Sequence, residues 1–252
     1  MTTKLEFGGH PSADSTPDLR DSRRPPQAPL HELASQRDLD LVYGQRFKDE
    51  HAMRKEGVWR EVCRFLQRFV VPDAPVLDVA CDRGHFIRNI RATEKWATDV
   101  RNVSHHLTGD IHFVRCDGPT MDGVLPADHF GTIFLSNYLE HLHSASEIMR
   151  QLTAAHVTMR RSGRLIVLQP NIRLIGSAYW DFLDHHKALT ERSLCEAVEA
   201  SGFTVERVIT RFLPFTTKGR LPQAPTLVRL YLACPPAWYV LGKQTLCVAR
   251  KS

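Results

Sequence analysis

The stretch Val76–Phe86 (VLDVACDRGHF) decides the fold of this chain. It opens on a short, mostly apolar run that ends in turn residues, which is typical of a strand buried inside a parallel sheet. The residues that follow, Gly84 among them, predict a tight turn and then a helix. Open α/β sheets bind nucleotides at such a turn, so we expect a ligand there.

The composition of the turn limits which ligand it can hold. A dinucleotide-binding turn carries several glycines, because the backbone must approach a pyrophosphate at the helix N-terminus. This turn has only Gly84, and the carboxylate of Asp82 in its middle would repel a phosphate. A positively charged nucleoside without phosphate avoids both problems. S-adenosylmethionine, with its sulfonium and ammonium groups, meets these conditions.

Short apolar runs alternate with helical patterns along the rest of the chain. This alternation predicts a mostly parallel sheet with helices on both faces. The strands are predicted at 76–80, 95–100, 112–117, 132–137, 164–168, 204–212 and 246–250. Helices are predicted at 145–159, closed by Arg161-Ser162-Gly163, and at 191–200.

Acidic residues end two of the predicted strands, Asp99 the second and Asp117 the third. A carboxylate at the first position can accept hydrogen bonds from both ribose hydroxyls, and one at the second from an adenine amino group. A single aspartate at a strand end commonly caps a turn. Asp82, Asp99 and Asp117 together are three acids in register, which favours a nucleoside site instead. The spacing alone also fits a nicotinamide cofactor, against which Asp82 and the missing glycines argue.

The overall composition narrows the class of protein. The 252 residues are 42% hydrophobic, and the net charge of +5 is too small to indicate a nucleic-acid-binding face. Six cysteines without a CxxC pair predict buried free thiols in a reducing compartment. The N-terminus shows no apolar signal region, and no segment reaches the ~18 apolar residues of a membrane span. We therefore expect a cytoplasmic protein without integral membrane segments.

We expect a disordered tail at 1–38 and a single domain at 39–252. The tail is rich in Pro, Ser, Asp and Arg and has too little apolar surface to fold. Residues 39–72 form a helical lead-in to the domain, and 214–244 form an apolar insertion that Pro235-Pro236 interrupts. The insertion is interpreted as core or lid, with a dimer contact or a membrane-surface helix as alternatives.

Several ordered motifs resemble those of class I S-adenosylmethionine-dependent methyltransferases. The likeness extends from Tyr43 to Lys251 and is greatest to bacterial small-molecule enzymes linked with surface-polysaccharide or natural-product pathways. It implies a Rossmann-like, doubly wound α/β sheet of about seven strands, the last of them antiparallel. The motifs are VLDVACDRGHF, EKWATDV, VRCDG, FLSNYLEHL and RRSGRLIVLQPN.

The resemblance also implies which residues bind the cofactor. Asp78, Ala80 and Gly84 would shape the methionine pocket, Asp99 would hold the ribose, Asp117 and Gly118 would meet the adenine, and Ser136 and Asn137 would lie beside the methyl group. The chain departs from the family pattern at two turn positions, where Ala80 and Asp82 replace glycines. Asp82 is the larger departure, because glycine adopts left-handed backbone conformations more readily than aspartate does.

The acceptor is expected to be a small polar molecule, methylated on a hydroxyl of a sugar or natural-product intermediate. Such an acceptor needs a base, for which His141 is the first candidate and His186 the alternative. Tyr138 and His185 are expected to contact the substrate. Because neighbouring side chains point in different directions, at most one of His185 and His186 should face the site. No spacing matches a zinc motif, so no metal is expected.

Two other functions remain open from the sequence. The chain could be a non-catalytic binding protein that kept the fold, which Asp82 alone favours. It could also methylate nucleic-acid bases, although the loop at Ser136–Leu139 lacks the two prolines typical of amino methylation. The oligomeric state is not predicted.

The composition of the tail generates a first prediction. Removal of residues 1–38 should leave the melting temperature of the remaining chain unchanged, because this segment contributes no apolar packing. Limited proteolysis should trim the same segment first. A truncated chain that fails to fold would contradict the assignment.

Overall fold

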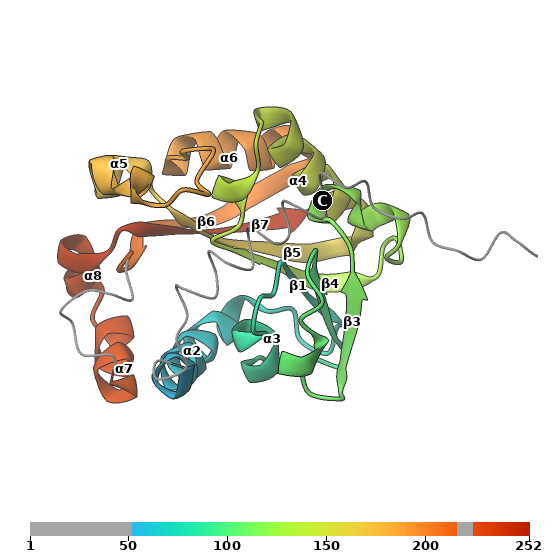
Figure 1. Cartoon of the computed structure of the whole chain (residues 1–252), viewed down its shortest axis with the longest axis horizontal. Coiled ribbons are helices and arrows are strands. Elements are labelled where there is room, and N and C mark those ends of the chain that lie inside the picture. Colours follow the sequence, from blue (N-terminus) through green and yellow to red (C-terminus); the bar gives the residue numbers. More distant parts are fainter. Residues whose placement is uncertain (1–51, 216–223) are drawn as a thin grey trace, which may run out of the picture. The chain divides into compact units, whose positions relative to one another are not determined.

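The computed structural model describes residues 52–215 and 224–252, which form a layered α/β structure around a seven-stranded sheet (Figure 1). The strand order is β3-β2-β1-β4-β5-β7-β6. The predicted tail at 1–38 and the first part of the lead-in, with Tyr43, lie outside the described residues. The strands are β1 (Val76–Val79), β2 (Lys95–Asp99), β3 (Ile111–Arg115), β4 (Phe130–Ser136), β5 (Met159–Pro170), β6 (Phe203–Leu213) and β7 (Gln244–Lys251).

The pairing of the strands confirms the predicted fold class. Strands β3, β2, β1, β4 and β5 run parallel to one another. The last strand, β7, inserts antiparallel between β5 and β6. The central strands are buried along almost their whole length, as expected of parallel strands covered on both faces.

Helices cover both faces of the sheet (Figure 1). Helices α4 (Ala145–Thr158) and α6 (Glu191–Ala200) pack on one face, and α2 (Ala52–Leu66), α3 (His85–Asn89) and α7 (Pro225–Ala233) on the other. The short helices α5 (Ile172–Ile175) and α8 (Pro235–Leu241) follow β5 and α7. The described 3-10 turns are η2 (Gln67–Phe69), η3 (Ser104–His106), η4 (Gly118–Gly123), η5 (Leu139–His141) and η6 (Gly176–Asp181).

The alternation of side chains along β1 sets up the two cores. Leu77 and Val79 pack in the core beneath α4 and α6, whereas Val76 packs with α2 and α3 on the opposite face. Asp78 shares the face of Val76, because residues two apart in a strand point the same way. The aromatic rings of Phe86 and Phe134 stack 3.8 Å apart in this second core and join α3 to β4.

Several boundaries differ from the sequence prediction. Asp117 does not end the third strand, because β3 stops at Arg115 and Asp117 precedes η4. Arg161-Ser162-Gly163 does not close the helix; α4 ends at Thr158, and β5 already begins at Met159. Met159 pairs with Phe130, and the next pair along is Thr132 with Arg164, so the intervening residues form a bulge in β5. Ser162 lies in that bulge with a φ of 60°. The turn residues therefore interrupt a strand and do not precede it.

The apolar insertion folds into α7 and α8, and Pro235 occupies the first turn of α8, where its missing N–H is tolerated. Its inner face packs on the domain: the Trp238 ring lies 5.7 Å from the Phe65 ring, and the Tyr231 hydroxyl donates to the Phe212 carbonyl at 2.6 Å. Leu230 and Tyr239 on the outer face are exposed. Residues 216–223 of the insertion lie outside the described residues.

The cysteines and the helix lengths test two further expectations. All six cysteines are free thiols, as predicted, but Cys234 is exposed, and Cys116 and Cys195 are half-buried, so the prediction that they are buried is wrong for these three. Within 52–215 and 224–252, none of the helices combines the length and the apolar character that crossing a membrane requires.

The predicted turn between β1 and α3 is present and contains three residues with positive φ. These are Ala80 (54°), Asp82 (48°) and Gly84 (67°). The N–H of Cys81 donates to the Thr98 carbonyl of β2 at 2.9 Å, which fixes the turn to the sheet edge. The left-handed conformation at Ala80 carries a steric penalty that a glycine would not have.

This strain predicts that Ala80→Gly stabilises the protein. A left-handed conformation costs alanine roughly 1–2 kcal/mol, whereas the extra backbone freedom of glycine costs about 0.5–1 kcal/mol. The free energy of unfolding in urea should therefore rise by up to about 1.5 kcal/mol. Ala92→Gly, at a position without positive φ, should lower it. Equal losses in both variants would show that Ala80 is not strained.

Candidate functional site

The carboxyl ends of β1, β2, β4 and β5 meet at one edge of the sheet, and most predicted site residues lie there. Asp78 is in β1, and Asp99 is the last residue of β2. Ser136 is the last residue of β4, and Gln169 comes near the end of β5. Parallel pairing places these positions side by side, which satisfies the main geometric expectation from the sequence.

Three carboxyl groups gather at the β1–β2 side of this edge. Asp78 and Asp99 are each only 4% exposed. Burial raises the pKa of Asp78 well above its usual value; the N–H of Ile87 opposes the shift, and the charges of Asp99 and Asp82 increase it. Burial also raises the pKa of Asp82, but the charges of Lys55 and Arg101 outweigh it and hold this pKa below its usual value.

Arg101 ties two of these acids together. Its Nη2 donates to Asp82 Oδ1 at 3.0 Å and to Asp99 Oδ2 at 3.3 Å, and its Nε donates to Asp99 Oδ1 at 3.2 Å. The backbone N–H groups of Asp82 and Arg101 donate to the same Asp99 carboxylate at 3.0 and 2.9 Å. Asp99 thus accepts as many hydrogen bonds as a carboxylate has lone pairs.

These contacts decide how well S-adenosylmethionine fits. Converging carboxyl groups suit a ligand with positive charges and hydroxyl groups, and they repel phosphate. Ribose hydroxyls reach Asp99 only if the Arg101 guanidinium turns away from it. The residues present therefore fit the cofactor on the condition that Arg101 moves. The sequence did not indicate Arg101 as a site residue, because the pattern of residues does not report the direction of a side chain.

The predicted adenine side lies at the start of η4. Asp117 is exposed and precedes this turn, and Gly118 is buried. A Cβ atom at Gly118 would lie 2.3 Å from the Tyr138 hydroxyl and 2.1 Å from Gln151 Oε1, so a larger residue would force these side chains to shift. The Tyr138 hydroxyl donates to Gln151 Oε1 at 3.2 Å. Tyr138, predicted to contact the substrate, therefore packs against a residue predicted to contact the cofactor.

The residues predicted to lie beside the methyl group continue from β4. Ser136 is half-buried, and Asn137 is exposed with a φ of 47°. The Asn137 side chain donates to Ser136 Oγ at 3.1 Å, and its backbone N–H donates to the Leu168 carbonyl of β5 at 2.9 Å. Both residues thus stay at the sheet edge, between the acids of β1–β2 and η5.

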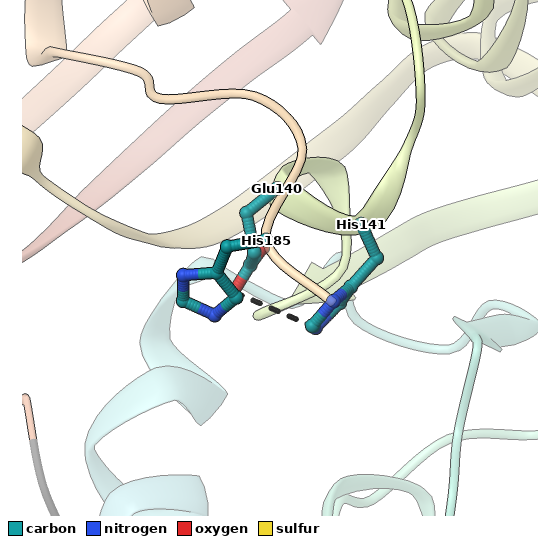
Figure 2. A group of neighbouring side chains, drawn as sticks. All are labelled: Glu140, His141 and His185. Carbon is teal, nitrogen blue, oxygen red and sulfur yellow. Dashed lines mark ion pairs between the residues drawn. The ribbon is translucent and has the colours of Figure 1, made fainter. Parts of the chain in front are cut away.

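A second polar cluster forms where η5 meets the segment after η6. Figure 2 shows that Glu140 and His141 come from η5 and His185 from the facing loop. The backbone N–H groups of His186 and Lys187 donate to the Glu140 carbonyl at 2.8 and 3.0 Å. His141 Nδ1 donates to the Asp184 carbonyl at 2.8 Å. These bonds fasten two segments that are distant in sequence.

Glu140 is the deeply buried member of this cluster, with 1% of its surface exposed. Gln169 Nε2 donates to Glu140 Oε2 at 3.0 Å. The other oxygen, Glu140 Oε1, lies 3.9 Å from His141 Nε2. Burial raises the pKa of Glu140, although His141 and the Gln169 hydrogen bond act in the opposite direction. Glu140 was not among the site residues predicted from the sequence.

The adjacent histidines point in different directions, as expected. The His185 ring is buried and lies 4.9 Å from the Phe182 ring and 5.3 Å from the His141 ring. The exposed His186 ring stacks on His143 at 4.2 Å. The structure therefore brings His141 and His185 together and leaves His186 at the surface. Glu140 and Asp184 adjoin these histidines in the sequence, which is the signal that could have found them.

Comparison with known proteins gives one family and many similar folds. A family model described as a methyltransferase domain matches residues 50–208, more than half of the chain. No curated protein sequence matches. Among solved structures, an S-adenosylmethionine-dependent methyltransferase from Archaeoglobus fulgidus is 19% identical, with 76% of this chain and 94% of that chain covered and a TM-score of 0.55.

Two further structures show how widely the fold is used. A similar methyltransferase from Mesorhizobium loti is 18% identical, with 73% of this chain and 95% of that chain covered and a TM-score of 0.52. The [4+2]-cyclase SpnF is also 18% identical, with 76% and 80% covered and a TM-score of 0.52. At this level of identity the likeness shows the fold alone.

The sheet order, the acids at its carboxyl edge and the family match lead to one assignment. The chain has the class I fold predicted from its motifs. It belongs to the methyltransferase domain family, whose members use S-adenosylmethionine as the methyl donor.

Proposed function

We propose that the chain transfers a methyl group from S-adenosylmethionine to a hydroxyl group of a small polar molecule, such as a sugar or a natural-product intermediate. The observation that carries this proposal is the placement of two polar clusters at one sheet edge. The carboxyl groups lie at the carboxyl ends of β1 and β2, and the Glu140–His141–His185 cluster follows β4 and β5. A donor held by the first would face an acceptor held by the second.

The proposed cofactor contacts follow the sequence prediction. Asp99 holds the ribose after Arg101 has turned away, and the charge of the carboxyl groups favours the cationic methionine end. The cofactor supplies the reactive methyl group, so the chain has to position the acceptor for in-line attack and exclude water. The other assigned positions are Asp78, Ala80 and Gly84 for methionine, Asp117 and Gly118 for adenine, and Ser136 and Asn137 beside the methyl group.

His141 is the residue that we assign to the acceptor hydroxyl. Because Nδ1 donates to the Asp184 carbonyl, the neutral ring keeps its lone pair on Nε2. This nitrogen can take the hydroxyl proton as a general base, and the Glu140 carboxylate beside it would stabilise the resulting imidazolium. His186 is less suited, because its ring is exposed and stacks on His143. His185 is proposed to contact the substrate, as is Tyr138.

One observation favours a second candidate function. The Asp82–Arg101–Asp99 contacts occupy the ribose-binding carboxylate, as would be expected of a family member that has lost cofactor binding. Calorimetric titration with S-adenosylmethionine separates the two functions, because such a member should give no binding heat. Methylation of nucleic-acid bases has no comparable support, given the small net charge and the missing prolines after β4.

Substitution of Asp99 tests the cofactor site. Asp99→Ala should weaken S-adenosylmethionine binding about ten- to a hundredfold, since loss of a charged hydrogen-bond acceptor typically costs roughly 1.5–3 kcal/mol. Asp110→Ala is the matched control, because Asp110 is exposed and precedes β3 at the opposite end of the strand. Calorimetry with both variants decides the point. Equal affinity of Asp99→Ala and the unchanged chain would exclude Asp99 from the site.

Substitution of His141 tests the acceptor site. His141→Asn can still donate to the Asp184 carbonyl but has no basic nitrogen. Single-turnover methyl transfer should fall by about 10²–10⁴, while the affinity for S-adenosylmethionine stays unchanged. His143→Ala, at an exposed neighbouring histidine, should retain the full rate. A loss of rate in His186→Ala alone would transfer the role to that residue.

A further inference from the structure

We propose that Glu140, His141 and His185 form a binding site for one divalent first-row transition-metal ion, with Zn²⁺ as the reference ion. One ligand atom of each residue lies within 4.8 Å of the others. Figure 2 shows the three side chains converging from η5 and the facing loop. Two imidazole nitrogens and one carboxylate oxygen are a donor set that binds Zn²⁺ and related ions in proteins.

The orientation of His141 is that of a metal ligand. A metal-binding histidine usually donates its second ring N–H to a backbone carbonyl or a carboxylate. Here Nδ1 donates to the Asp184 carbonyl at 2.8 Å and also lies 3.3 Å from Asp184 Oδ2. Nε2, which keeps the lone pair, lies 3.9 Å from Glu140 Oε1, too far for a direct hydrogen bond. A cation between these two acceptors would satisfy both.

Glu140 is positioned in a similar way. Its Oε2 accepts a hydrogen bond from Gln169 at 3.0 Å, so that Oε1 is the atom that faces His141. A carboxylate with 1% of its surface exposed has lost almost all of its hydration. Buried charges are normally paired or bound to a metal. A divalent ion would supply the positive charge that pairs with the Glu140 carboxylate. Gln169 would be the outer partner that orients this ligand.

His185 is held in place by aromatic packing and by the backbone. Its ring lies 4.7 Å from the Tyr179 ring and 4.9 Å from the Phe182 ring, and the residue is 9% exposed. The hydrogen bonds from the next two backbone N–H groups to the Glu140 carbonyl keep the loop against η5. The distance between the two ligand-bearing segments is therefore fixed before any ion binds.

The cluster needs a modest contraction to close around an ion. Ligand atoms bound at the distances of Zn²⁺ in a tetrahedral arrangement lie roughly 3.4 Å apart, compared with the 4.8 Å span seen here. Side-chain rotations that move the ligand atoms by about 1 Å each would close that gap. Three protein ligands leave a fourth position open, as in catalytic zinc sites.

The open position gives the ion a role that rests on the proposed function. A hydroxyl bound to the metal loses its proton to solvent more readily. The oxygen then forms the bond to the methyl carbon, and the sulfur–carbon bond breaks with its electron pair left on sulfur. Because Nε2 cannot bind the ion and accept a proton at once, the metal would replace His141 as the group that activates the acceptor.

Metal binding can be tested without methyl transfer. The untagged full chain, treated with a chelator, should bind one equivalent of Zn²⁺ in calorimetry, and Co²⁺ should give visible absorption bands that Zn²⁺ abolishes. Glu140→Gln and His185→Phe keep the shape and the aromatic packing but remove a ligand. Both should bind Zn²⁺ more than ~100-fold more weakly, because even outer-shell partners commonly contribute about 10- to 100-fold.

The controls separate this site from the surface histidines. His143 and His186 stack at the surface and are the alternative metal-binding pair; His143→Ala should bind Zn²⁺ as tightly as the unchanged chain. Gln169→Leu keeps all three ligands and should bind about 10- to 100-fold more weakly. Zn²⁺ should raise the melting temperature of the unchanged chain and not that of the ligand variants, which also shows whether those variants fold.

Three results would overturn the proposal. The first is that the unchanged chain takes up no Zn²⁺. The second is that the ligand variants bind Zn²⁺ as tightly as the unchanged chain, and the third is that His143→Ala abolishes Zn²⁺ binding. The outcome is also distinct from that of the proposed function. A chain that binds Zn²⁺ at this site but transfers no methyl group supports the metal site and contradicts the function. A chain that transfers methyl groups at full rate after chelation, with no Zn²⁺ bound, supports the proposed function and contradicts the metal site.

Discussion

The parallel pairing of β1 with β2 and β4 is the constraint on which the rest of this structure depends. Val79 pairs with Thr98 on one side and with Leu135 on the other, so the three strands end level with one another. Every loop that follows them therefore leaves the sheet at the same edge. The strands are buried on both faces, so this edge is where their backbone ends and polar side chains can reach a ligand.

The same edge concentrates negative charge, and the structure compensates it in two ways. On the β1–β2 side, Arg101 and Lys55 offset the acids. On the β4–β5 side, Glu140 faces a histidine and accepts one amide hydrogen bond. Because a buried acid without compensation is costly, we propose that each side accepts a cation in place of the partner that it has now. The proposed cation is the sulfonium ligand on the β1–β2 side and a metal ion on the β4–β5 side.

The two clusters differ in what holds them together. The first depends on side-chain hydrogen bonds between Arg101 and two aspartates, which can open when a ligand competes for the same oxygens. The second depends on backbone hydrogen bonds to the Glu140 carbonyl and on the aromatic rings around His185. Because a backbone bond does not change with rotamer, the segments that carry Glu140 and His185 stay together even when their side chains rotate.

The sequence by itself determined the order of strands and helices, the turn at Asp82 and the acid that ends β2, Asp99. These features follow from local periodicity and from the rule that parallel strands end at one edge, so no knowledge of distant contacts was needed. Only the tertiary structure decided that Arg101 covers Asp99, that β5 begins at Met159, and that Glu140 meets His185. Each of these depends on a side-chain rotamer, on pairing with a neighbouring strand, or on two loops far apart in the chain, and hydrophobic periodicity reports none of them.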